Sequence, residues 1–454
     1  MHHIQHPHPT RSGVDMTEGN ITGHLIRFAL PLLAGNIFQQ LYNMVDTWVV
    51  GNFVSNEAFS AVGTVGPIVN MLIGCFLGFS SGAGVVISQY YGARRTERVH
   101  DAVHTALVLT VILCAVFTAL GIGFTPLMLR LMNTPAEVFP ESSAYLTIYF
   151  GGILRAVGDS RRPFYFLVVS AVLNTALDLL FVLRFGMGVE GVAWATVIAQ
   201  AVSALLVIVV LLRTEQTVRL IPRDLRIHLP VLRQIIRVGV PSALQMAITA
   251  FSNVFVQSYI NSFGADCMGG WTAYTKIDQL MLLPMQSLAL SATTFVGQNL
   301  GRGNEPRARQ GVRRALAIAM AATVLVMIPV LVFSPQMTAF FNRKPEVVAY
   351  GALLLRCISP FYVLCCFNQV YAAALRGAGN SKATMIIMLC SFVLFRQVYL
   401  FIMSHYISHE LIPLVMGYPA GWLVCSAATL IYYRRTSFLS TRLVAEDGSK
   451  EDIQ

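Results

Sequence analysis

The chain has 454 residues, of which 55% are hydrophobic and 12% charged, and its mean hydropathy is +0.63. This composition excludes an ordinary soluble globular protein and indicates a protein that crosses a membrane many times. The formal net charge of +10 does not indicate a nucleic-acid partner, because the basic residues lie in the connections between apolar runs.

Apolar runs long enough to cross a membrane recur along the chain. A helix needs about 20 residues to cross roughly 30 Å of hydrocarbon, and runs of this length are bounded here by Arg, Gly, Pro or Asn. We therefore predict an all-α polytopic membrane protein with about 12 transmembrane helices. The predicted spans are 26–50, 59–82, 100–122, 164–184, 190–212, 236–261, 271–297, 312–334, 347–373, 383–403 and 411–433, with a short candidate at 141–153 as the fourth.

The tail before the first span is polar and rich in histidine. It contains no apolar core of a secretory signal, so we expect the first span to direct membrane insertion. Short polar tails of this kind are more often disordered than metal-binding, and the eight cysteines show no Cys-x-x-Cys spacing. We therefore expect neither a metal site nor an organic cofactor.

Basic residues occur in alternate connections. Six arginines fill the central connection between 213 and 237, whereas connections such as 52–58 and 185–191 carry no Lys or Arg. Cytoplasmic connections of membrane proteins are enriched in Lys and Arg, so this alternation predicts that both termini lie in the cytoplasm. Only Arg130 and the pair at 343–344 oppose the pattern.

The chain contains an internal repeat. Gln89 matches Gln298 at an offset of 209, but Leu154 matches Leu375 at an offset of 221. About 12 residues, or roughly three helical turns, are therefore missing before Leu154, which predicts a shortened fourth helix.

The repeat predicts two pseudo-symmetric six-helix bundles related by an axis along the membrane normal. Between them, a basic linker containing two prolines lets the halves rock. The predicted divisions are a cytoplasmic tail at 1–25, an N-terminal lobe at 26–213, a cytoplasmic linker at 214–235, a C-terminal lobe at 236–435 and a cytoplasmic tail at 436–454.

Four segments together resemble one known family. They are IRFALPLLAGNIFQQLYNMVDTWVVG at 26–51, LRAVGDSRRP at 154–163, LNTALDLLF at 173–181, and 273–303, which begins AYTKIDQLM. In order and spacing they are similar to the multidrug and toxic compound extrusion family. The resemblance implies a transporter of the bacterial cytoplasmic membrane, not an enzyme, in which inward H⁺ or Na⁺ drives export of bulky, often cationic organic compounds by alternating access. We expect it to act as a monomer.

Ionisable residues inside the spans are candidates for the coupling site, since each costs at least about 2.5 kcal/mol to insert. Asn174 and Asp178 lie one helical turn apart and therefore share a face. The resemblance places a cation site on these two residues and Asp46, and Thr196 is a further candidate for the same site. The alternative for Asp178 is an ion pair with Arg184 near the outer surface.

Further polar and apolar residues are candidates for the substrate cleft. Lys276 and Asp278 are two residues apart and face different directions, and we expect Arg396 to face the cleft or to pair with a carboxylate. Met side chains offer adaptable packing for varied ligands, although every apolar candidate is equally compatible with interhelical packing. The remaining cleft candidates are Phe38, Gln39, Tyr42, Met281, Met285 and Gln286.

Two departures from the family pattern bear on function. Some members carry a Glu in the seventh span, but 240–255 contains no carboxylate, which favours H⁺ over Na⁺. The shortened fourth helix raises the alternative of a transport-impaired remnant or membrane scaffold. A lipid-precursor flippase of the wider superfamily is the other alternative, but it requires a strongly cationic cavity, whereas the cleft candidates are mainly neutral.

Overall fold

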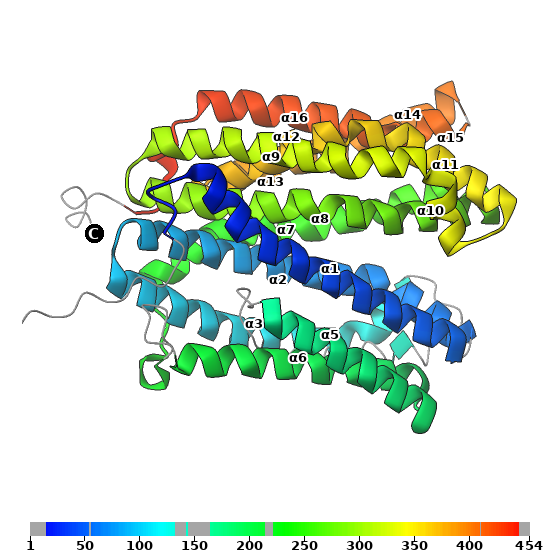
Figure 1. Cartoon of the computed structure of the whole chain (residues 1–454), viewed down its shortest axis with the longest axis horizontal. Helices are drawn as coiled ribbons and strands as arrows, with labels where there is room; N and C mark the ends of the chain where they lie inside the picture. Colours follow the sequence, from blue (N-terminus) through cyan, green and yellow to red (C-terminus); the bar gives the residue numbers. More distant parts are fainter. Residues whose placement is uncertain are drawn as a thin grey trace, which may run out of the picture.

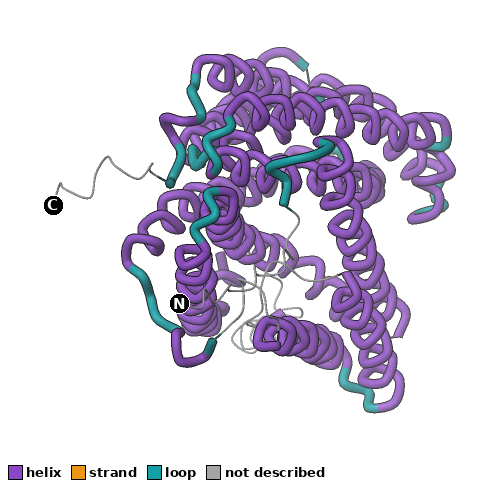
Figure 2. Tube along the Cα trace, turned by 60° about the vertical axis from the view of Figure 1, so that its left-hand side comes forward, coloured by secondary structure: helices purple, strands orange, loops and turns teal. Residues whose placement is uncertain are grey.

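The structure, a computed structural model, describes residues 15–53, 56–131, 142–143, 164–213, 221–408 and 410–444. These ranges contain helices and loops but no strand (Figure 2), which confirms the predicted all-α class. Ten helical stretches within them are long and apolar enough to cross a membrane. The predicted fourth helix lies outside the described residues except for 142 and 143, so its shortening stays a prediction.

The N-terminal lobe is built from long helices. They are α1 (Ile21–Phe53), α2 (Asn56–Gly92), α3 (Thr96–Leu131), α5 (Phe164–Leu179), which continues as the π-helical turn η1 (Leu180–Arg184), and α6 (Gly188–Arg213). A 3-10 turn, η2 (Pro222–Asp224), lies in the central connection.

Within the described ranges, the helices of the C-terminal lobe are interrupted more often than those of the N-terminal lobe. Its uninterrupted helices are α7 (Leu229–Asn261), α8 (Ala265–Gly301), α9 (Glu305–Val332) and the short α10 (Ser334–Phe341). The tenth crossing is α11 (Pro345–Ile358), η3 (Ser359–Phe361) and α12 (Tyr362–Gly377). The eleventh crossing is α13 (Ser381–Leu389), η4 (Cys390–Phe395), α14 (Arg396–Ile402) and η5 (Met403–Ile407). The twelfth is α15 (Leu411–Val415) and α16 (Gly417–Arg435), and the 3-10 turn η6 (Leu439–Thr441) follows it.

The interruptions have local causes. Pro360 lies in the 3-10 turn η3, and proline cannot donate the hydrogen bond that a continuous α-helix requires. The η4 and η5 segments are π-helical, and such single turns locally widen a helix. The single apolar runs at 347–373 and 383–403 predict one continuous α-helix each. The tenth and eleventh crossings are instead divided by these 3-10 and π-helical turns.

The helices lie along the long axis of the molecule, with the C-terminal lobe on one side and α2, α3, α5 and α6 on the other (Figure 1). Helix α1 crosses diagonally from the C-terminal lobe to α5. The two lobes meet where α2 packs against α7 and where α1 packs against α8. These two contacts are related by the sequence repeat, as expected for an approximate two-fold axis between the lobes.

One end of the molecule carries the arginine-rich connections that follow α2 and precede α7, and we call it the basic end. Several helices continue beyond the predicted apolar runs at this end. Helix α2 reaches Gly92 rather than residue 82, and α7 begins at Leu229 rather than residue 236. A helix satisfies its own backbone hydrogen bonds, so it continues past the hydrocarbon where neighbouring helices cover it. The apolar run therefore marks the membrane but not the end of the helix.

The helices from the two lobes approach most closely at glycines at this end. A Cβ atom at Gly92 would lie 1.8 Å from the backbone oxygen of Gln298, and one at Gly301 would lie 1.9 Å from that of Gln89. Small residues allow membrane helices to pack with their backbones in close contact. The repeat-related ends of α2 and α8 are therefore held together by backbone proximity.

A pair of alanine substitutions on α2 tests this contact. We expect Gly92→Ala to destabilise the protein by about 1–3 kcal/mol, as overpacking does. Gly84, on the same helix, has open space around its Cβ position, so Gly84→Ala should be neutral or stabilising by up to about 1 kcal/mol. Thermal unfolding followed by tryptophan fluorescence measures both. Equal melting temperatures for the two variants would contradict the close contact.

Candidate functional site

A polar cluster lies inside the N-terminal lobe between α5 and α6. Asn174 and Asp178 are 1% and 0% exposed, and they lie one turn apart on α5. The Asn174 side-chain amide donates to the Thr196 hydroxyl at 3.5 Å, and that hydroxyl donates to the backbone oxygen of Val192 at 3.0 Å. The structure thus brings three predicted site residues together between α5 and α6, with Asn174 and Asp178 buried and Thr196 partly buried.

The other predicted members of this site are placed only through their helices. Asp46 and Tyr42 lie on α1, which packs against α5, but their side chains are not among those described. Arg184 is exposed at the end of η1 whereas Asp178 is fully buried. This difference in burial favours a role for Asp178 inside the lobe over a surface ion pair with Arg184.

An aromatic cluster surrounds Asp278 inside the C-terminal lobe. The Tyr362 hydroxyl donates to the Asp278 carboxylate, and the Tyr274 hydroxyl lies 3.3 Å from that of Tyr362. Trp271 packs against Tyr274 with ring centroids 5.0 Å apart. Lys276 is partly buried and takes no part in this set of contacts. Asp278 is therefore a partly buried, hydrogen-bonded carboxylate, on a different side of α8 from Lys276.

Arg396 finds neutral partners instead of a carboxylate. One of its guanidinium nitrogens, Nη2, donates to Ser252 Oγ at 3.1 Å and to Asn253 Oδ1 at 2.8 Å, both on α7. The guanidinium also lies over the Tyr418 ring, 4.9 Å from its centroid. Only 4% of the residue is exposed. Of the two predicted outcomes, pairing with a carboxylate is therefore wrong among the described residues.

The remaining cleft candidates differ in burial. Met281 and Met285 are 1% and 0% exposed inside the C-terminal lobe, whereas Gln286 is exposed. Phe38 and Gln39 are partly buried on α1. In this arrangement the two methionines pack in the interior, and their contact with substrate stays a prediction.

Polar side chains join the two lobes along α1 and α8. The Asn36 amide donates to Ser287 Oγ at 3.4 Å, and the Gln40 amide donates to Gln279 Oε1 at 3.2 Å. Such hydrogen bonds between membrane helices contribute about 0.6 kcal/mol on average. Each bond therefore contributes little to holding α1 against α8.

The segment 15–20, which we call the N-terminal strap, covers the basic end of the C-terminal lobe. The Met16 side chain is fully buried, its backbone N–H donates to Gln298 Oε1 at 2.8 Å, and its backbone oxygen accepts from Asn299 at 3.3 Å. Glu18 accepts a hydrogen bond of 2.6 Å from Arg302. The strap thereby ties the start of α1 to the end of α8.

The segment 437–444, which we call the C-terminal strap, contacts both lobes. The backbone N–H of Leu443 donates to Gln89 Oε1 at 2.8 Å, and its oxygen accepts from Gln234 at 3.1 Å. Leu443 and Val444 pack among buried residues of α2, α3 and α7. Gln89 also donates to the backbone oxygen of Gly377 at 2.8 Å. The two straps and the glycine contacts therefore join the two lobes at the basic end.

Sequence reasoning missed the straps and the aromatic cluster. The sequence did contain one signal for the straps. Gln89 and Gln298 are matching polar residues that follow two predicted apolar spans. The aromatic side chains around Asp278 come from α8 and α12, and no pattern within one segment brings them together.

Comparisons with known proteins agree on one family. A family model described as MatE matches residues 31–180 and 241–402. The chain is 30% identical to the probable multidrug resistance protein YoeA of Bacillus subtilis, with 90% of this chain and 92% of that protein covered. It is 28% identical to the probable multidrug resistance protein YpnP of the same organism, covering 95% and 99%. A MOP superfamily transporter from Pyrococcus furiosus has a similar fold, with a TM-score of 0.87 at 24% identity over 94% of this chain and 98% of that one.

Replacing Arg396 tests its role as a link between α7 and α14. Arg396→Lys keeps the charge but loses the planar guanidinium that bonds and stacks at once. We expect it to lower the stability by about 1–3 kcal/mol, measured as a fall in melting temperature. Arg434→Lys, an exposed change at the end of α16, is the control. A melting temperature unchanged in Arg396→Lys would mean that the link does not stabilise the lobe.

The N-terminal strap makes stability depend on pH. The hydrogen bond and the charge of Arg302 hold the pKa of the Glu18 carboxyl below its ordinary value of 4.5. A carboxyl with a lowered pKa in the folded state stabilises the fold above 4.5, and the contribution is lost as the pH falls through the lowered value. We expect wild type to melt above Glu18→Gln at pH 7 and the difference to vanish in acid. A difference that persists after Glu18 is protonated would contradict the ion pair as its source.

Proposed function

Since the chain belongs to the MatE family, the multidrug and toxic compound extrusion family, we propose that it is an antiporter that exports bulky, often cationic organic compounds in exchange for a cation, with H⁺ favoured over Na⁺. The relatives named as probable multidrug resistance proteins support drug-like substrates. The observation that carries the coupling proposal is the buried pair Asn174 and Asp178 within a membrane-spanning lobe, with Asn174 bonded to the partly buried Thr196.

The orientation follows from the charges at the two ends. We place the basic end, with both straps, in the cytoplasm of a bacterial inner membrane, because positive residues favour that side. The glycine contacts and the straps join the lobes at this end and support the proposal that it is closed. The arrangement is therefore a cytoplasm-closed state of an alternating-access cycle, and the cycle requires that the straps release before the cytoplasmic side opens.

The proton step in this proposal uses the N-terminal lobe. A carboxylate buried in a membrane protein carries an insertion cost of at least about 2.5 kcal/mol, and binding a proton removes the charge. Asp178 takes up a proton from outside, which changes the hydrogen bonds of Asn174 and Thr196 and shifts α5 against α6. Release of the proton into the cytoplasm resets the cluster.

The substrate proposal uses the interface between the lobes. Phe38, Gln39 and Gln286 lie on α1 and α8, the helices that meet there. Neutral side chains and adaptable apolar groups suit many substrates better than a single charged pocket. A mainly neutral interface also favours drug export over the flipping of an anionic lipid precursor.

The remnant alternative rests on the roughly 12 residues missing before Leu154 relative to the repeat. It predicts that the fold forms without a working cycle. Restoring the missing residues is therefore the change that separates an active exporter from an inactive scaffold.

Ethidium efflux from cells that overproduce the chain tests these proposals. We expect efflux by wild type, its loss in Asp178→Asn, and its retention in Glu190→Gln, which changes an exposed acid on α6. Efflux that survives in Asp178→Asn would refute coupling through this residue. If wild type is inactive and becomes active only with about 12 residues inserted before Leu154, the chain is a remnant.

A further inference from the structure

Two hollows lie on one seam, formed by α7 on one side and α13, η4 and α14 on the other. The first, of about 280 Å³, is at the basic end. It is lined by Arg237, Pro241, Gly379, Asn380, Lys382 and Thr441. Its shape comes from the turn between α12 and α13, where Gly379 has a φ of +89°, and from Thr441, which covers it from the C-terminal strap. The hollow therefore presents two cations from different helices.

These two cations have no ion-pair partner within the described residues. Arg237 and Lys382 are both exposed, and the ion pairs formed in this part of the chain involve other arginines, such as Arg302 with Glu18 and Arg309 with Glu305. The Asn380 side chain donates to the Tyr432 hydroxyl at 2.8 Å and accepts from the N–H of Ala383 at 3.4 Å. The turn is thus fixed by its own hydrogen bonds, and the two charges are left for an anion.

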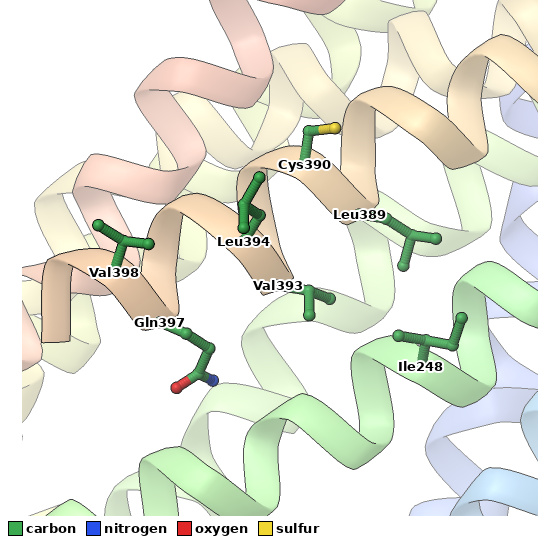
Figure 3. Close-up of a pocket in the computed structure, with 7 residues that line it drawn as sticks. All are labelled: Ile248, Leu389, Cys390, Val393, Leu394, Gln397 and Val398. Carbon is green, nitrogen blue, oxygen red and sulfur yellow. The ribbon is translucent and has the colours of Figure 1, made fainter. Parts of the chain in front are cut away.

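The second hollow, of about 460 Å³, lies further along the same seam within the membrane-spanning part. It is lined by Ile248, Leu389, Cys390, Val393, Leu394, Gln397 and Val398. Figure 3 shows Leu389, Val393 and Gln397 projecting toward α7, where Ile248 faces them. The Gln397 amide donates to Ser252 O at 3.0 Å and to Ser252 Oγ at 2.9 Å. The one polar side chain of the groove is therefore already paired.

The distance between the two hollows matches the distance between the headgroup and the acyl chain of one lipid molecule. Arg237 and Ile248 are 11 residues apart on α7, which is about 16 Å of helix. Lys382 and Leu389 are 7 residues apart on α13, or about 10 Å. A headgroup bound by the cations would therefore have its acyl chain beside the groove.

We propose that this seam binds one anionic phospholipid of the cytoplasmic leaflet, with its phosphate at Arg237 and Lys382 and an acyl chain along the groove. Basic pockets between membrane helices on the cytoplasmic side suit anionic headgroups. The groove explains why a lipid is favoured over a soluble anion, since its lining is mainly aliphatic and the Gln397 amide is already bonded to Ser252. The π-helical turn η4, from Cys390 to Phe395, forms the wall of the groove.

The lipid would act on the helix that forms the lobe interface. Helix α7 packs against α2 of the other lobe and against α13 within its own. A lipid held between α7 and α13 therefore holds α7 in the C-terminal lobe. This binding is independent of the substrate and of the coupling cation.

Native mass spectrometry of the full chain in detergent tests the site, with phosphatidylglycerol and phosphatidylcholine as probes. We expect wild type to retain phosphatidylglycerol more strongly than phosphatidylcholine. The double variant Arg237→Gln with Lys382→Gln should weaken that retention by about thirtyfold, as expected for two basic side chains at a membrane surface. Arg313→Gln with Arg314→Gln removes the same charge from exposed positions on α9 and should leave retention unchanged.

Two further arms separate a lipid from a free anion. Val393→Trp fills the groove without changing any charge, and we expect it to reduce phosphatidylglycerol retention, with inorganic phosphate a poor competitor. Equal retention of the two lipids, or equal loss in the α9 control, would overturn the proposal in favour of a general basic surface. Full competition by inorganic phosphate together with no effect of Val393→Trp would overturn it in favour of a soluble-anion pocket.

Discussion

The contact between the ends of α2 and α8 is the constraint on which the arrangement of the lobes depends. With glycine at positions 92 and 301, each backbone reaches the other without intervening side chains. That proximity places the Gln89 and Gln298 side chains where each accepts a backbone N–H from a terminal segment. A single close crossing thus sets the positions of both straps at the basic end of the molecule.

The two lobes use the same scaffold for different polar chemistry. At the offset of 221, Asn174 corresponds to Phe395 and Asp178 to Tyr399. The corresponding crossing of the C-terminal lobe therefore has no acid at this level, and the adjacent Arg396 bonds to Ser252 and Asn253 instead. A coupling role confined to the N-terminal lobe is consistent with this difference. The partly buried carboxylate of the C-terminal lobe, Asp278, comes from α8 and is held by tyrosine.

Much of this architecture was predictable from local patterns, and the remainder was not. Apolar runs predict the crossings, and the spacing of Asn174 and Asp178 predicts their shared face, because both depend only on helical geometry. The partners of Arg396 lie more than a hundred residues away on α7, so its environment depends on tertiary packing. The lengths of α2 and α7 were underestimated because a buried helix end needs no apolar sequence. The fourth helix lies outside the described residues, and its shortening rests on the repeat alone.

The contacts of the C-terminal strap impose an order on how the basic end is assembled. Gln89 lies in the second helix to be synthesised, yet the backbone group that it binds belongs to Leu443. Throughout translation of the intervening crossings, the glutamine has no access to that partner, and the apolar surface of α2, α3 and α7 that later covers Leu443 stays open. Assembly of this end is therefore a late, post-insertion event. A protein fused directly after Val444 would lie next to the site where Leu443 and Val444 pack against α2, α3 and α7.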